Sequence, residues 1–110
     1  MDKNTAIKAV RFLVAALEDQ GLHVKEAVLF GSLARDEWDV DSDIDIAVVS
    51  SDFENKDLFE RAKLTGRAEV EAIRRFSVPI DVILLTPDEY MHGNSLVAQF
   101  VREGESVYEA

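Results

Sequence analysis

The sequence predicts an α/β (α+β) fold in which a mixed β-sheet of three to four strands has helices packed against it. Three apolar runs, at 24–30, 44–50 and 78–85, have the length and composition of buried strands. Amphipathic segments precede the first run and separate the second from the third. A chain of 110 residues is long enough for one core but too short for a second lobe. We therefore expect a single domain over residues 1–110.

The first expected element is an amphipathic helix over 5–20. Its apolar residues recur at helical spacing, Asn4 or Thr5 can cap its start, and Gly21 suits the position just after its end. The strand at 24–30 follows and has Val28, Leu29 and Phe30 as its buried end. An acidic loop at 36–42 then leads to a β-branched strand at 44–50.

A longer helix is expected at 57–76, after a loop at 52–56. Its inward stripe should consist of Phe59, Ala62, Gly66, Val70 and Ile73. The third strand, at 78–85, is followed by Thr86-Pro87-Asp88-Glu89, which has the proline and the acids typical of a helix start. A short helix over 95–102, ended by Gly104, and a small edge strand at 106–108 complete the order.

Composition narrows the classes of function. No segment approaches the roughly 18 consecutive apolar residues that span a membrane, and the start lacks the layout of a secretory signal. The absence of cysteine excludes a disulfide framework and thiolate chemistry and fits a cytoplasmic location. His23 and His92 have no zinc-site spacing. A net charge of −10 argues against direct nucleic-acid binding, and it suits a basic protein partner or simply solubility.

The strongest functional signal joins the end of the first strand to the start of the second. Gly31-Ser32 follows the apolar strand directly, where the backbone N–H groups of a helix start can receive phosphate oxygens. Ten residues past that pair, Asp43 and Asp45 are spaced i, i+2, which places both carboxylates on one face of a strand. Hard oxygen ligands beside a phosphate cradle are what a magnesium–nucleotide site requires.

This signal also constrains the topology. If these residues serve one site, the end of the first strand lies beside the start of the second, so the two strands are antiparallel. The helix at 57–76 is long enough for a right-handed crossover, which makes the third strand parallel to the second. Asp81, an acid in an otherwise apolar strand, then returns to the same edge of the sheet. We expect three acids to converge there.

With Gly31-Ser32, Asp43-Ile44-Asp45 and Asp81 in this order, the chain resembles the DNA polymerase beta-like nucleotidyltransferase superfamily. Within it, the chain is most similar to the minimal nucleotidyltransferases (MNT domains). The resemblance covers nearly the whole chain, including the closing segment at 102–109, and implies the nucleotidyltransferase fold. Many members have glycine where this sequence has Asp36, which alters the turn that leaves the phosphate loop and adds a negative charge.

The resemblance implies that Asp43 and Asp45 hold two Mg²⁺ ions and that Asp81 completes the coordination of one of them. From the residues alone, Asp43 and Asp45 could instead cap the start of a strand. Asp81 could be satisfied by backbone N–H groups or by a surface lysine.

The resemblance also implies that Gly31 and Ser32 bind the phosphates of the nucleotide, with Arg35 as a further contact. Ser32 could equally be a helix N-cap, and Arg35 could form a salt bridge to the acidic loop. In that loop, Trp38 is expected to pack over the first turn of the helix rather than to stack on adenine.

The charged face of the long helix offers a weaker signal. Lys63 and Arg67 lie one turn apart and could point toward the phosphates, but a solvated helix face is the preferred interpretation.

The implied activity is Mg²⁺-dependent transfer of a nucleoside monophosphate, expected to be AMP from ATP, onto a hydroxyl group. Members of this size resemble the antitoxin of HEPN/MNT toxin–antitoxin modules. The partner would be an all-helical HEPN ribonuclease, and the acceptor a tyrosine hydroxyl on that toxin. Another copy of the chain could also present the acceptor. Two alternatives stay open: an antitoxin that inhibits by occlusion without turnover, and a nucleotidyltransferase subunit that modifies small molecules.

Overall fold

The computed structural model describes residues 2–31, 34 and 43–110 of the chain. Its helices and strands, in chain order, are α1 (Lys3–Asp19), β1 (Glu26–Phe30), β2 (Ile44–Val49), the 3₁₀ turn η1 (Ser51–Phe53), α2 (Leu58–Phe76), β3 (Ile80–Leu85), α3 (Pro87–His92), α4 (Leu96–Arg102) and β4 (Glu105–Glu109). Within this part of the chain, none of the helices has the length and apolar composition that crossing a bilayer requires.

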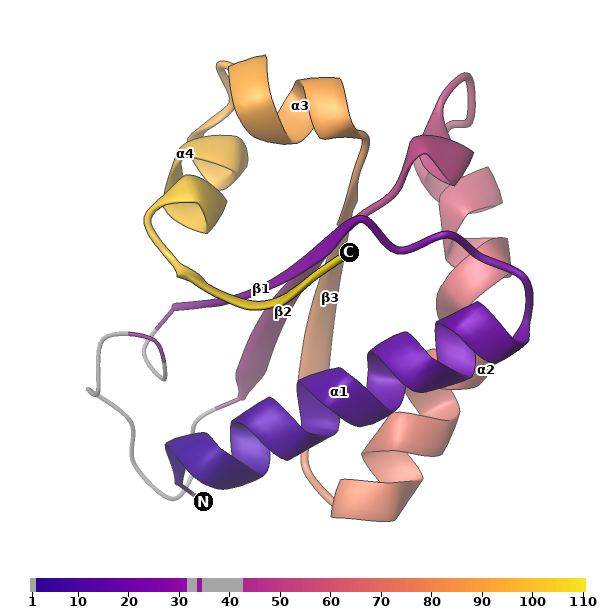
Figure 1. Ribbon diagram of the computed structural model, residues 1–110, viewed down its shortest axis with the longest axis vertical. Helices are drawn as coiled ribbons and strands as arrows, with labels where there is room; N and C mark the ends of the chain where they lie inside the picture. Colours follow the sequence, from indigo (N-terminus) through magenta and orange to yellow (C-terminus); the bar gives the residue numbers. More distant parts are fainter. Residues whose placement is uncertain (1, 32–33, 35–42) are drawn as a thin grey trace.

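The strands form one mixed sheet in the order β3-β2-β1-β4 (Figure 1). Strand β1 pairs antiparallel with both β2 and β4, whereas β2 and β3 are parallel. The predicted mixed sheet is therefore confirmed, and so are the two strand directions inferred from the spacing of the acids. The strands are shorter than predicted, since β1 and β3 each begin two residues later.

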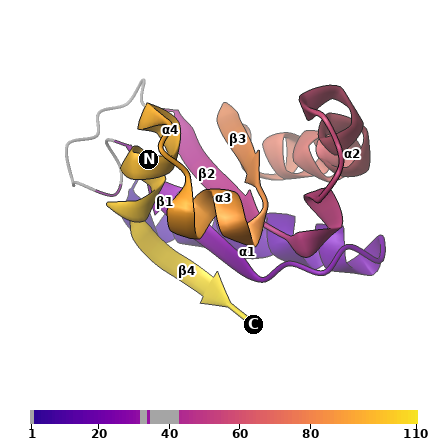
Figure 2. The ribbon, with the colours of Figure 1, turned by 90° about the horizontal axis from the view of Figure 1, so that it is seen from above.

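Helices cover both faces of this sheet. One core cluster joins α1 and the small residues of α2 to Leu29, Ile46 and Val48 of the sheet. On the other face, a smaller cluster packs Val101 of α4 against Val28. Figure 2 shows α2 on one side of the molecule and β4 on the other. Successive residues of each strand therefore face different helical layers.

The first helix begins earlier than expected. The Asp2 carboxylate accepts a hydrogen bond from the Thr5 N–H at 2.9 Å, so Asp2 is the N-cap rather than Asn4 or Thr5. At the other end, Gly21 has a φ of +92°. The Leu22 N–H donates to the Leu17 carbonyl at 3.1 Å, as in a Schellman motif. The predicted role of Gly21 is confirmed.

The predicted inward stripe of α2 is wrong. The residues that α2 buries are Arg61, Thr65, Ala68 and Ala72. Phe59, by contrast, is 69% exposed, Val70 is 47% exposed and Ile73 is 38% exposed. The small side chains of Thr65, Ala68 and Ala72 allow α2 to lie close to α1 and β3. The larger apolar residues of the helix are left on the outside.

Arg61 tolerates burial because each nitrogen of its guanidinium donates a hydrogen bond. It donates to Glu89 Oε1 at 2.7 Å, to the Leu84 carbonyl at 3.2 Å and to the Lys56 carbonyl at 2.9 Å. Burial acts to raise the pKa of the Glu89 carboxyl, but the hydrogen bonds from Arg61 and from Thr86 outweigh it and lower that pKa. This ion pair joins α2 to α3 and permits a charged residue on the inner face.

Candidate functional site

Phe30, Asp45 and Asp81 form a row across three strands at one edge of the sheet. Phe30 at the end of β1 is the register partner of Asp45, and Asp45 is the register partner of Asp81. Side chains of register partners leave the sheet on the same face. Asp45 is half-buried and Asp81 is exposed. The structure thus brings together two acids that are 36 positions apart in the sequence.

The row faces the layer of α3 and α4. Ile44 and Ile46, which flank Asp45, pack into the cluster with α1 and α2, so Asp45 points to the opposite face. On that face, the cluster of α3 and α4 rests on Val28 and Leu85 rather than on the two acids. The helices that cover this side therefore leave Asp81 open to solvent.

Asp43 lies just before β2 and is exposed. The start of β2 is fixed against the residues that precede β3, because the Ile44 N–H donates to the Pro79 carbonyl at 3.0 Å. If the alternation of β2 is extended by two residues, Asp43 falls on the same face as Asp45. That Asp43 and Asp45 share one face stays a prediction from their i, i+2 spacing.

Gly31 brings the end of β1 against the carboxylate of Asp45. Its φ of +74° lies in the left-handed region. A Cβ atom at this position would overlap Asp45 Oδ2 and lie 3.1 Å from Asp45 Cγ. Only glycine leaves room for that carboxylate, so the backbone that leads into the 32–42 segment begins directly beside the acid row.

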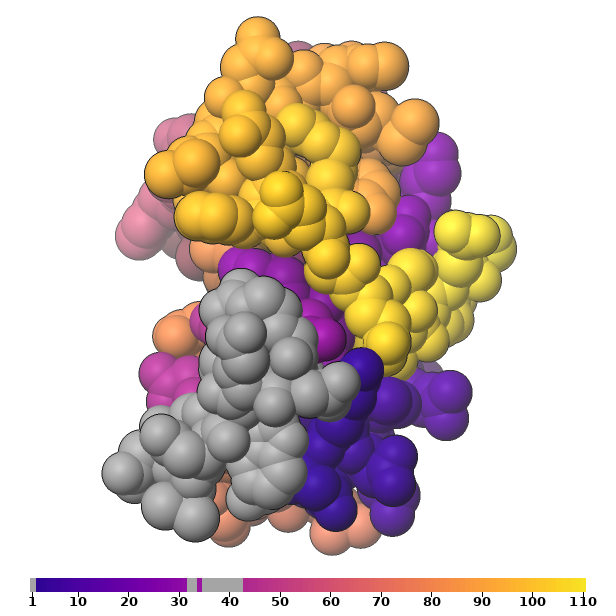
Figure 3. All heavy atoms as spheres, turned by 90° about the vertical axis from the view of Figure 1, so that its left-hand side faces the viewer, coloured from indigo at the N-terminus to yellow at the C-terminus, as the bar shows by residue number. Residues whose placement is uncertain are grey.

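A hollow of about 270 Å³ adjoins Gly31. It is lined by Phe30, Gly31, Ala34, Phe100, Glu103 and Gly104, so it separates the end of β1 from α4. In Figure 3 the yellow atoms of α4 lie directly above the purple atoms at the end of β1. Two aromatic rings and a carboxylate thus border the hollow next to Gly31.

The donor set of this edge fits Mg²⁺, which prefers carboxylate oxygens. Among the residues that the structure describes, no three Asp, Glu, His or Cys side chains lie close enough together to hold a metal ion by themselves. The expected convergence of three acids is therefore met only in part, by the Asp45–Asp81 pair and the nearby Asp43. Mg²⁺ commonly takes one or two carboxylates and fills its remaining positions with waters and substrate phosphates.

Several predicted site residues lie outside the described residues. They are Ser32, Arg35, Asp36 and Trp38, together with the rest of the acidic loop at 36–42.

Lys63 and Arg67 lie on the outer side of α2. The Lys63 ammonium is 4.6 Å from the centre of the Phe59 ring, and Arg67 Nε is 3.7 Å from Glu71 Oε1. The solvated helix face that was preferred for these two residues is confirmed.

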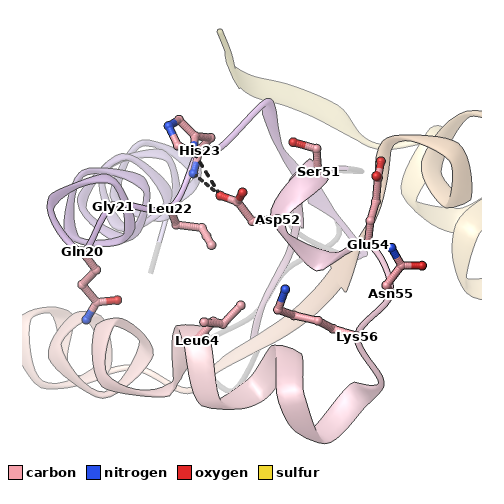
Figure 4. A pocket seen from close by; sticks show the side chains of 10 residues that line it. All are labelled: Gln20, Gly21, Leu22, His23, Ser51, Asp52, Glu54, Asn55, Lys56 and Leu64. Carbon is pink, nitrogen blue, oxygen red and sulfur yellow. Dashed lines mark hydrogen bonds and ion pairs between the residues drawn. The ribbon is translucent and has the colours of Figure 1, made fainter.

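A second hollow, of about 520 Å³, lies at the other end of the sheet and was not foreseen (Figure 4). It is bordered by the loop after α1, by η1 and by Leu64 of α2. The His23 N–H donates to Asp52 Oδ2 at 2.7 Å, and His23 Nδ1 is 3.2 Å from the same oxygen. The backbone bond from His23 is the main reason that the pKa of Asp52 is lowered. Because 29 residues separate the two partners, no local pattern could have indicated this contact.

Comparisons with known proteins place this geometry in context. A family model described as the nucleotidyltransferase domain matches residues 10–105. A solved structure from Sulfolobus solfataricus, assigned as a nucleotidyltransferase, is 25% identical, has a TM-score of 0.60 and covers 96% of this chain and 87% of that chain. No curated protein matches the sequence.

Two solved structures of toxin–antitoxin pairs are also similar. One, with AMP-PNP, is 21% identical with a TM-score of 0.63, and the match covers 100% of this chain and 75% of that chain. The other, a mutant of the MntA-HpeT pair, is 19% identical with a TM-score of 0.59 and the same two coverages. At these identities the likeness is one of fold.

Proposed function

Because the chain belongs to the nucleotidyltransferase domain family, we propose that it transfers a nucleoside monophosphate, AMP from ATP, to a hydroxyl group. We propose further that residues 1–110 form one minimal nucleotidyltransferase domain. The observation that carries this proposal is the register pair of Asp45 and Asp81, of which Asp45 lies directly against Gly31. Carboxylates next to a glycine, which lets a ligand approach the backbone, provide what a metal-bound triphosphate needs.

In this proposal Asp43, Asp45 and Asp81 are the metal ligands. When bound, two Mg²⁺ ions would offset the charge of the triphosphate and stabilise the attacking and leaving oxygens of an in-line displacement. Asp81 is the more exposed of the two register partners. Its carboxylate is therefore the group that we assign to accept the proton of the incoming hydroxyl.

We assign the phosphates of the nucleotide to the segment that begins at Gly31. Gly31 has a left-handed φ and lies against the Asp45 carboxylate. Ser32 and Arg35 follow immediately in the sequence, and we assign to them a hydroxyl contact and a cationic contact to phosphate oxygens.

We propose that the acceptor hydroxyl is presented by a helical partner protein, and that the chain is the antitoxin of a HEPN ribonuclease. The fold likeness to toxin–antitoxin structures supports this. So does the surface of α4, where Leu96 is 64% exposed and Phe100 is 50% exposed. Phe100 also lines the hollow beside Gly31, so a partner that rests on α4 would bring its hydroxyl to the acid row. A basic partner would complement the net charge of −10.

The alternative function is an antitoxin that blocks its partner without turnover. One observation favours it: no set of three metal-ligating side chains is preassembled in the described part of the chain. Modification of small molecules has less support, because the hollow of about 270 Å³ beside Gly31 is small for both a nucleotide and an acceptor.

Intact-mass spectrometry separates these functions. After incubation with ATP, Mg²⁺ and the cognate helical protein, the partner should gain about 329 Da for each transferred AMP, a value fixed by adenylyl transfer. The Asp81→Asn variant is the matched control, because it changes one carboxylate to an amide of equal size. An unchanged partner mass together with a stoichiometric inhibitory complex would establish occlusion instead. Modification of free nucleotides or small alcohols alone would exclude a protein acceptor.

A further inference from the structure

The outer face of α2 carries a continuous apolar stripe. We call Phe59, Ala62, Gly66, Val70 and Ile73 the α2 stripe. Gly66 is half-buried and the other four residues are exposed, Phe59 to 69%. Charged residues accompany the stripe along one side of the helix. An exposed apolar surface of this kind on an otherwise charged protein marks a surface that contacts another molecule.

The spacing of the α2 stripe is symmetric about its central residue. Read from either end, the steps between its members are three, four, four and three residues. We propose that two copies of the chain pair antiparallel through this stripe, with the two-fold axis at Gly66. Phe59 then faces the partner's Ile73 and Ala62 faces the partner's Val70. A two-fold interface requires such self-complementarity.

The sizes of the stripe residues fit two helices that cross. Helices packed at an angle are closest at the crossing point and diverge from it, so the contact needs small residues at the centre and larger ones at the ends. The α2 stripe has Gly66 at its centre and Phe59 and Ile73 at its ends.

No contact within the described part of the chain explains the glycine at this position. A Cβ atom on Gly66 would have no atom within 4 Å among those of the described structure. Glycine in the interior of a helix weakens it relative to alanine. A close approach of two backbones at the crossing point gives Gly66 a physical reason.

The charges beside the stripe are complementary under the same symmetry. One flank of α2 carries Glu60, Lys63, Arg67, Glu71 and Arg74 in that order. In an antiparallel two-fold pair this flank meets its own copy. Lys63 then lies opposite the partner's Glu71, and Glu60 lies opposite the partner's Arg74. Only Arg67 meets a like charge, and Glu71 of its own chain is 3.7 Å away to compensate.

The overall charge of the protein favours this surface over others. Two copies of a chain with a net charge of −10 repel each other over most of their surface. Apart from the buried Arg61, helix α2 has four basic and three acidic residues, so it does not share the strong negative charge of the chain as a whole. The stripe also faces away from the sheet, whereas Asp45 and Asp81 point from the sheet face opposite α2. Pairing therefore leaves the acid row open and is independent of the proposed function.

Sedimentation equilibrium tests the pairing. The wild-type protein should reach twice the 12.3 kDa of one chain, with a dissociation constant on the order of micromolar because a single helix pair is a small interface. The Gly66→Lys variant places two ammonium groups at the axis and should weaken the pair by at least about tenfold. The matched control is Asn4→Lys, the same charged side chain on the exposed face of α1. Both variants should keep the wild-type circular dichroism.

A charge exchange tests the orientation. Lys63 and Glu71 are more than two helical turns apart and do not meet within one chain. The single variants Lys63→Glu and Glu71→Lys should each raise the dissociation constant by roughly two- to tenfold, and the double variant should restore it. A wild-type protein that stays monomeric at millimolar concentration would overturn the proposal. Three other results would overturn it as well: a Gly66→Lys variant that dimerises as tightly as the wild type, or a double variant whose dissociation constant is as high as those of the single variants. The third is a set of stripe variants that lose binding to the helical partner protein but still dimerise.

Discussion

Replacement of Gly31 by alanine tests the geometry on which the candidate site depends. The new methyl group would overlap Asp45 Oδ2 and come within 3.1 Å of Asp45 Cγ. The left-handed backbone alone should cost about 1–2 kcal/mol in an alanine. Displacement of the Asp45 side chain should add about 1–3 kcal/mol, as overpacking of a filled space commonly does. We therefore expect Gly31→Ala to lower the free energy of unfolding by roughly 2–5 kcal/mol.

The chain offers a matched control for the backbone contribution. Gly21 also has a left-handed φ, of +92°, but a Cβ atom there has nothing within 4 Å. Gly21→Ala should therefore lose only about 1–2 kcal/mol. Urea unfolding of both variants isolates the clash with Asp45 as the difference between the two losses. Calorimetry with Mg²⁺ and AMP-PNP should show weaker binding for Gly31→Ala and unchanged binding for Gly21→Ala.

A double-mutant cycle identifies the residue that the methyl group meets. With Asp45→Ala as the background, the overlapping carboxylate is gone, so Gly31→Ala should lose about 1–2 kcal/mol, as Gly21→Ala does. Equal losses for Gly31→Ala in the two backgrounds would refute the contact between Gly31 and Asp45. Equal losses at the two glycines of the otherwise unchanged protein would refute it as well.

Three further predictions concern single carboxylates. Asp81→Asn should slow AMP transfer at least about 100-fold, and in calorimetry it should weaken Mg²⁺–ATP binding less than Asp43→Asn does. Glu89→Gln should lower the free energy of unfolding at pH 7 by about 1–3 kcal/mol because it leaves the buried charge of Arg61 unpaired. The Glu89 pKa is lowered from its ordinary value of 4.5, so this stability exists above that pH and is lost on acidification; urea unfolding at pH 3 should show a smaller difference. Asp52→Asn should lower the protection of the His23 amide against hydrogen exchange at pH 7, measured relative to the intrinsic exchange rate. Acidification of the wild type below about pH 3.8 should lower the same protection factor, because the Asp52 pKa is lowered from 3.8 and the carboxylate is lost only below that pH.

The arrangement of the sheet could be predicted because the site and the topology constrain each other. Gly31 and Asp45 can serve one site only if β1 and β2 are antiparallel, and Asp81 can join them only if β3 is parallel to β2. The register of Asp45 with Asp81 follows from these directions together with the burial pattern. The local capping signals at Gly21 and Thr86 were also readable, since each acts within one turn of its helix.

Contacts between distant segments could not be predicted in the same way. The burial of Arg61 depends on Glu89, which lies 28 residues later, and the His23–Asp52 contact spans 29 residues. The two residues of each pair come into contact only when the fold brings their loops or helices together. A charged side chain in a helix gives no local sign that a distant carboxylate will neutralise it, so the usual expectation places it in solvent.

The wrong prediction for the inward face of α2 has the same cause, since the burial of Arg61 could not be foreseen from local sequence. Periodicity identifies an apolar stripe but does not say which body the stripe contacts, the core of its own chain or the surface of another. In α2 the residues that face the core of the chain include Ala68, Ala72 and Arg61, whose charge is neutralised by Glu89. The larger apolar residues Phe59 and Ile73 are then left exposed, where they can contact a second surface. The α2 stripe was predicted to face the core of its own chain, and we propose that it contacts a second copy instead. The Gly66→Lys and charge-exchange variants can establish or exclude this contact.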